Sequence, residues 1–259
     1  MLNALIKNPA ALGFAQAAVA AAFALAVALA ARRRGIRLTG ETAVALARGL
    51  VQIVAVGLAL AALLKGPRWT APVMLAAMIA AAARISVRRA QGLPGAMRIS
   101  FYSIAAGAGS VIALLVLLGA IDTAIATLIP VGSMIVANAM NGNALALDRF
   151  RAEVAAHTGE IETALALGAA PRATVAPYVQ AGLTASLIPS INNLRSLGIV
   201  WIPGLMAGMV LSGAQPFYAS LYQFVVLAAI LAASGLTCLI STWLVADRIF
   251  TPAEQLRLR

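Results

Sequence analysis

The side chains that could do chemistry are few in this chain. Among 259 residues there is one histidine, His157, one cysteine, Cys238, and eight acidic residues. Tight transition-metal sites need a cluster of histidine, cysteine and carboxylate side chains, and covalent catalysis needs a nucleophile beside a base. One histidine and one distant cysteine supply neither. The sequence therefore predicts no catalytic residue, no metal site and no enzymatic activity.

Nucleotide binding by a phosphate loop is excluded by the lysines. A Walker A loop places Gly-Lys before Ser or Thr, so that backbone N–H groups and the lysine hold the phosphates. The two lysines of this chain are Lys7, followed by Asn8, and Lys65, followed by Gly66. We expect this chain to bind no cofactor itself.

Amide side chains concentrate in two apolar segments. Asn138 and Asn141 recur at helical spacing on one face, and Asn192 and Asn193 form a second group. Polar groups in a membrane segment usually face the interior of the bundle. These amides therefore either line a substrate pathway or hydrogen-bond between helices, and the sequence leaves both open. The methionines Met134 and Met206 could offer soft contacts to a substrate in the same region, or could simply fill space.

A short helix is predicted in the longest polar stretch, residues 146–184. Thr158 can cap its N-terminus, Gly168 suits the left-handed position after its last turn, and Pro171 should prevent the helix from resuming.

The faces of this short helix differ in chemistry. Glu160 and Glu162 lie in the first turn, where the helix dipole favours anions, and Ile161 and Leu165 share an apolar face. A helix this short is marginal alone, so it must dock on its own bundle or on another protein.

The composition places these features in a membrane protein. Apolar residues make up 62% of the chain, charged residues 10%, and the mean hydropathy is +0.95. Runs of about 20 apolar residues cross a bilayer as helices. The sequence predicts an all-α protein of one domain, residues 1–259, with seven spans. We expect the sixth to continue through Pro189, Gly198 and Pro203, because membrane helices tolerate such residues. The predicted spans are 10–31, 41–64, 71–88, 98–119, 123–145, 185–212 and 217–246.

The basic residues predict the orientation. Fourteen arginines lie in the first, third and fifth loops and the tail, against three Lys and Arg residues on the opposite side. Basic residues favour the cytoplasmic side, which predicts the N-terminus outside and the C-terminus in the cytoplasm. Membrane anchoring then accounts for the net charge of +11, so we expect no nucleic-acid partner.

The sequence around the short helix resembles a known family. The stretch Glu162-Thr-Ala-Leu-Ala-Leu-Gly168 is similar to the coupling-helix motif of ABC-transporter permeases, although Thr163 replaces an alanine of the importer motif. Together with Asn138-Ala-Met-Asn141, Ile188-Pro-Ser-Ile-Asn192 and Pro203-Gly-Leu-Met-Ala-Gly208, it resembles the permease of the Fet-type iron-export ABC transporters and the membrane half of a plant aluminium-tolerance transporter.

The resemblance implies a multi-pass permease of the cell inner membrane, working as a homodimer and exporting a small substrate such as iron. ATP and magnesium would bind on a separate cytoplasmic ATPase, which Glu160, Ile161, Glu162, Leu165 and Gly168 would contact. Two other readings stay open: a secondary, ion-coupled transporter, although its carboxylates Glu41, Asp122 and Asp247 lie near span ends, and a non-transporting membrane scaffold.

Overall fold

Helices account for nearly all of the regular structure. A computed structural model describes residues 8–35, 39–64, 66–90 and 92–257, and these form nine α-helices and no β-strand. The predicted all-α class is confirmed. The chain divides into two compact units, Met1–Gly66 and Pro67–Arg259. The single domain expected for residues 1–259 stays a prediction.

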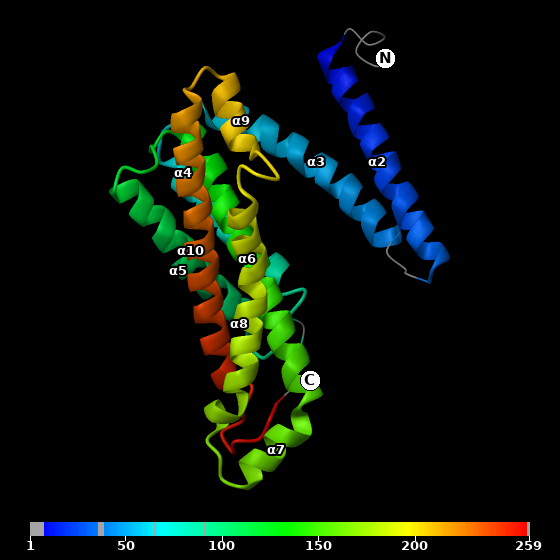
Figure 1. Ribbon diagram of the computed structural model, residues 1–259, viewed down its shortest axis with the longest axis vertical. Helices are drawn as coiled ribbons and strands as arrows, with labels where there is room; N and C mark the ends of the chain where they lie inside the picture. The colour runs from blue at the N-terminus through cyan, green and yellow to red at the C-terminus, as the bar shows by residue number, and fades with distance from the viewer. Residues whose placement is uncertain (1–7, 36–38, 65, 91, 258–259) are drawn as a thin grey trace. The chain divides into compact units, whose positions relative to one another are not determined.

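The smaller unit is a pair of apolar helices, α2, Pro9–Arg33, and α3, Thr39–Leu63 (Figure 1). Asn8 begins α2, because its side-chain oxygen accepts a hydrogen bond from the Ala10 N–H at 3.0 Å. Large apolar side chains on both helices stay exposed, such as Phe23 at 73% and Leu58 at 71%. Such a surface requires lipid or another protein around it.

The larger unit is built around two long helices, α6, Ile125–Ala156, and α10, Pro216–Arg248 (Figure 1). They pack against each other, and each also contacts α5 and α8. The short helix α7 connects α6 to α8 at one end of the unit, and α9 precedes α10 at the other. Five helices complete this unit: α4, Thr70–Ser86; α5, Ala96–Leu117; α7, Thr158–Ala166; α8, Pro171–Ser196; and α9, Gly204–Leu211.

Small residues allow the helices of this unit to approach closely. A Cβ atom at Gly107 of α5 would lie 2.1 Å from the Thr237 Oγ1 atom and 2.6 Å from the Thr237 nitrogen of α10. No side chain fits at that distance, so glycine sets how closely α5 and α10 cross.

A buried amide links three of the helices. The Asn143 Nδ2 group of α6 donates to Ser86 Oγ of α4 at 2.7 Å and to Ser100 Oγ of α5 at 2.9 Å. All three residues have no exposed surface. Asn143 therefore holds the bundle together, as a polar group between membrane helices is expected to do.

Six of the seven predicted segments coincide with helices. Among the described residues, α2, α3, α5, α6 and α10 are long and apolar enough to cross a bilayer, and α4, with 17 residues, is a shorter apolar helix. The chain is therefore a multi-pass membrane protein. The number of seven spans and the orientation stay predictions.

The sixth predicted segment, 185–212, is not one helix. Helix α8 ends at Ser196, and α9 begins at Gly204. Between them Gly198 takes a φ of +74°, and its N–H donates to the Trp201 carbonyl at 3.1 Å. Proline alone did not end the helix, since Pro189 lies inside α8. The helix ends where the left-handed Gly198 is followed by Pro203, because neither residue continues an α-helix.

Candidate functional site

The predicted short helix is present as α7, Thr158–Ala166, but it begins differently from expectation. Thr158 is not its N-cap: its hydroxyl donates to the carbonyls of Val154 at 3.1 Å and Ala155 at 3.2 Å. Helix α6 runs to Ala156, further than the predicted span, so its last carbonyls are within reach of this hydroxyl. Thr158 therefore satisfies the end of α6 instead of the start of α7.

The end of α7 follows the prediction. Gly168 has a φ of +88°, which confirms the left-handed conformation. Its N–H donates to the Leu165 carbonyl at 2.9 Å, and the next N–H, of Ala169, donates to the Ala164 carbonyl at 3.0 Å. These two bonds close the helix end in a Schellman arrangement. Pro171 does not block a helix but begins α8, where a missing N–H costs nothing.

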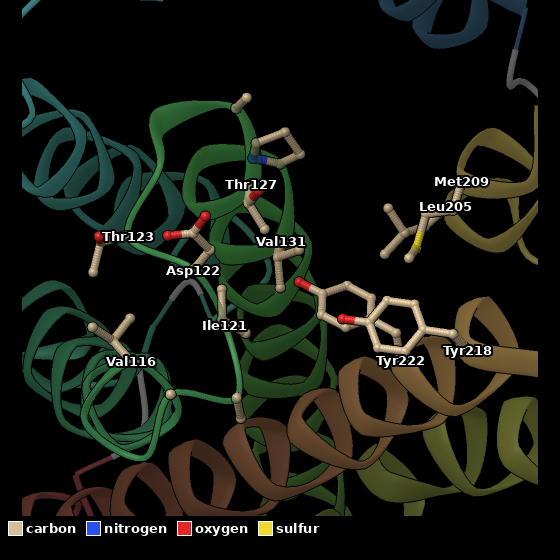
Figure 2. Close-up of a pocket in the computed structure, with 14 residues that line it drawn as sticks. Val116, Ile121, Asp122, Thr123, Thr127, Val131, Leu205, Met209, Tyr218 and Tyr222 are labelled. Atoms are coloured by element: carbon tan, nitrogen blue, oxygen red, sulfur yellow. The ribbon is translucent and has the colours of Figure 1, made fainter. Parts of the chain in front are cut away.

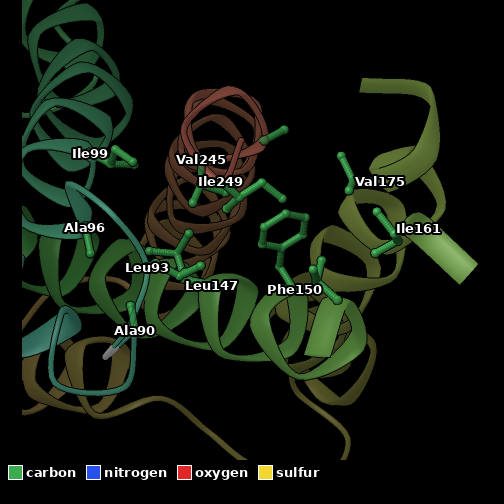
Figure 3. Packing of buried hydrophobic residues seen from close by; sticks show 12 residues of the cluster. Ala90, Leu93, Ala96, Ile99, Leu147, Phe150, Ile161, Val175, Val245 and Ile249 are labelled. Carbon is green, nitrogen blue, oxygen red and sulfur yellow. The ribbon is translucent and has the colours of Figure 1, made fainter. Parts of the chain in front are cut away.

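Ile161 fixes α7 to its own bundle. Its side chain is 1% exposed and lies beside Val175 of α8, facing Phe150 of α6 (Figure 3). Val154 of α6 and Ile249, just after α10, belong to the same buried cluster. This placement corrects the expectation that Ile161 faces a partner, because an enclosed side chain offers it no surface.

The opposite side of α7 is open. Glu160 and Glu162 are exposed, and so is Gly168. Leu167 is 83% exposed, an unusual position for a large apolar side chain. It lies six residues after Ile161, on another face, and this spacing is the signal by which the sequence could have indicated it. Leu165 is half-buried against the cluster.

The tail after α10 forms a groove with α7. Glu162 and Leu165 line it from α7, and residues 253–256 line it from the tail, around a volume of about 530 Å³. The tail is held by the Arg257 N–H, which donates to the Ile249 carbonyl at 2.6 Å. Glu254 takes a φ of +58° there. The groove thus presents two carboxylates, from Glu162 and Glu254.

Polar contacts fix the neighbouring helix ends. The His157 ring stacks on Tyr178 of α8 with centroids 4.9 Å apart. Burial and the nearby Glu160 carboxylate raise the pKa of the Tyr178 phenol. Arg172, at the start of α8, pairs with Asp247 at the end of α10 through two hydrogen bonds. Hydrogen bonding to Asp247 raises the pKa of the Arg172 guanidinium, so this pair stays charged.

The six expected pathway residues lie mostly on the surface of the larger unit. Asn141, Asn192 and Asn193 are exposed, and Met134 and Met206 are half-buried.

Asn138 is also half-buried, and its Nδ2 group donates to the Met134 carbonyl of its own helix at 2.8 Å. The structure does not enclose these residues in one cavity. The asparagine that the described bundle encloses is instead Asn143.

In the part of the chain that the structure describes, no group of three or more His, Cys, Asp and Glu side chains could hold a metal ion. Cys238 is buried within α10, and half-exposed His157 lies at the end of α6.

Comparison with known proteins identifies relatives. The model of UPF0014, described as an uncharacterised protein family, matches residues 14–250. The UPF0014 membrane protein STAR2 of Oryza sativa subsp. japonica is 35% identical over 241 residues, which cover 92% of this chain and 84% of the rice protein. Protein ALUMINUM SENSITIVE 3 of Arabidopsis thaliana is 29% identical over 247 residues, covering 95% of this chain and 90% of that protein.

A bacterial relative carries a name that refers to transport. The protein named "Probable iron export permease protein FetB", of Escherichia coli strain K12, is 30% identical over 169 residues, which cover 65% of each chain. No solved structure matches the chain.

Proposed function

Because the chain belongs to the UPF0014 family of membrane proteins, we propose that it is the membrane-spanning permease subunit of an ABC transporter that exports a small substrate. The bacterial relative named as an iron export permease makes iron the first substrate to test. The energy would come from ATP hydrolysed on a separate cytoplasmic subunit.

The proposal rests on the way α7 packs against the bundle. Its inner face is locked by Ile161 into a cluster with Phe150 of α6 and Val175 of α8. Both neighbours are long helices of the bundle, and α7 is also joined to them by chain. A force on α7 would therefore move the ends of α6 and α8, because a packed interior does not deform independently.

The outer face of α7 suits a protein partner. It offers the carboxylates of Glu160 and Glu162, the exposed Leu167 and the Gly168 turn. Leu165 lies at the edge of this face, half-buried against the bundle. An ATPase surface with an apolar pocket and nearby basic groups would complement it.

The remaining features follow from this assignment. The arginine bias favours the α7 end in the cytoplasm and the N-terminus outside, in the inner membrane of the cell. This chain would bind no cofactor, and ATP and magnesium would bind on the partner ATPase.

The exposed amides favour a second copy of the chain. Asn141, Asn192 and Asn193 are exposed on the described chain, and polar side chains in a bilayer are costly against lipid. In a homodimer they would face a shared, water-filled pathway with Asn138. Met134 and Met206 would supply soft contacts near it.

Co-purification tests the proposal. The tagged permease is expressed with the candidate ATPase, and the complex is assayed for bound ATPase and for ATP turnover with and without iron. Leu167→Asp should reduce both bound ATPase and stimulated turnover at least tenfold, since it puts a charge into an apolar contact.

The control is Leu211→Asp, which changes a side chain that is 89% exposed at the opposite end of the bundle. It should leave ATPase binding intact. If the wild-type permease recruits no ATPase, or if both variants bind and stimulate it equally well, the assignment of α7 fails.

A further inference from the structure

A second hollow lies at the end of the larger unit opposite α7. It has a volume of about 700 Å³, it is open on one side, and it is lined by the end of α5, the α5–α6 loop, the start of α6, α9 and the start of α10 (Figure 2). We refer to it as the upper cavity. None of the expected pathway residues lines it.

Local turns position its polar groups. Helix α5 ends at Leu117, and Gly119, two residues later, takes a φ of +69°, after which the loop turns toward α6. The Asp122 carboxylate accepts a hydrogen bond from the Ala124 N–H at 3.1 Å, which holds this side chain just before α6. On α10, Tyr218 and Tyr222 are one turn apart, with ring centroids 6.3 Å apart. Figure 2 shows both phenol oxygens directed toward the loop that carries Ile121.

The electrostatics of the upper cavity favour a cation. Asp122 is the one charged residue among the described residues that line it. The phenol oxygens of the two tyrosines are directed toward the loop of this carboxylate and add partial negative charge.

One hydroxyl in the upper cavity lacks a partner. The Tyr222 Oη atom is buried, and no described residue forms a hydrogen bond with it. Buried hydroxyls are nearly always hydrogen-bonded in folded proteins. A ligand with an N–H or O–H group would satisfy this atom once the side chains that cover it move aside.

The size and walls argue against a bare metal ion. A tight metal site needs several histidine, cysteine or carboxylate ligands, whereas this cavity has one carboxylate. Its other polar side chains are the hydroxyls of Thr123, Thr127, Tyr218 and Tyr222, and no described group of three His, Cys, Asp and Glu side chains lies there. Cavities of this volume that combine apolar walls with polar groups suit organic molecules.

We propose that the upper cavity binds a protonated organic amine. The ammonium N–H groups donate to the Asp122 carboxylate and to the Tyr222 hydroxyl, and the carbon skeleton contacts the Tyr218 ring and the apolar wall. This inference goes beyond the proposed function and does not depend on an ATPase.

Calorimetric titration of the purified chain in lipid nanodiscs tests it, with three matched ligands. Benzylamine should bind at least tenfold more tightly than benzyl alcohol, which is neutral and of similar shape. Asp122→Asn should weaken benzylamine at least tenfold, as expected for a lost hydrogen bond to a charged group.

Tyr222→Phe provides the sharper test. It should weaken benzylamine about tenfold yet change benzyltrimethylammonium less than twofold, because a quaternary ammonium has no N–H to donate. Asp148→Asn and Tyr102→Phe remove the same groups away from the cavity and should change neither ligand. Thermal unfolding of each variant checks that it is folded.

Three results would overturn the proposal: equal affinity for benzyl alcohol and benzylamine, equal loss of both cations in Tyr222→Phe, or binding of ferrous ion that Asp122→Asn abolishes while benzylamine does not bind. Since no ATPase is present, each result leaves the coupling assignment untouched.

Discussion

Replacing Ile161 with alanine should release α7 from the bundle. The side chain is 1% exposed, and α7 has nine residues, too few to be stable undocked. Ile→Ala substitutions in a packed core cost about 2 to 5 kcal/mol. At about 1.4 kcal/mol per factor of ten, the docking equilibrium of α7 should fall by about thirtyfold to several thousandfold.

Hydrogen exchange in nanodiscs measures this change directly. The amides of residues 158–167 should lose protection by that factor, while the amides of α10 keep theirs. The matched control is Ile135→Ala, which removes the same atoms from a side chain of α6 with no exposed surface, about 30 Å along the helix from α7. It should destabilise the bundle without a selective effect on α7.

The functional readout is ATP turnover of the co-purified ATPase. Ile161→Ala should abolish the stimulation by the permease, and Ile135→Ala should retain it at a temperature where both variants are folded. Unchanged exchange at 158–167 in Ile161→Ala would refute the reasoning that this side chain seats α7. If α7 is released selectively and the ATPase is still fully stimulated, α7 does not transmit movement between the ATPase and the bundle.

Three further predictions concern backbone and packing. Gly168→Val should cost about 1 to 3 kcal/mol at the end of α7 and lower ATPase co-purification, since its φ of +88° disfavours a β-branched residue, whereas Gly159→Ala should have no such effect. Gly107→Ala should lower the unfolding temperature in detergent, because the added methyl group clashes with Thr237 of α10 at a cost of about 1 to 3 kcal/mol. Gly109→Ala, with open space around it, should leave the unfolding temperature unchanged. Asn143→Ala should cost about 1 to 2 kcal/mol in the same unfolding assay, and an unchanged midpoint would contradict its role between three helices.

Much of this architecture could be predicted because apolar runs and helix-end signals are local. The apolar runs predicted six helices, and the motif around Gly168 predicted α7 and the left-handed turn at its end. The same residues carried the resemblance to Fet-type and aluminium-tolerance permeases, which the family membership confirms.

The errors lie where tertiary packing decides. Helix α6 continues past the apolar run because Leu147, Phe150 and Val154 bury one face of an otherwise polar turn, a helical spacing that was present in the sequence. Asn141 and Asn143 are two residues apart, yet one is exposed and the other is enclosed by serines of α4 and α5. No local signal separates them, because the partners come from other helices.

The buried cluster that holds α7 forms late during synthesis of the chain. It brings together Leu93, Phe150 and Ile161 with Ile249 and Leu256, side chains drawn from most of the larger unit. While the chain is still being made, α6, α7 and α8 leave the ribosome before residues 249–256 exist. The buried cluster that holds α7 is therefore incomplete until residues 249–256 leave the ribosome. Until then α7 lacks a complete binding surface on the bundle, and in the proposed transporter this delay would separate membrane insertion from assembly with the ATPase.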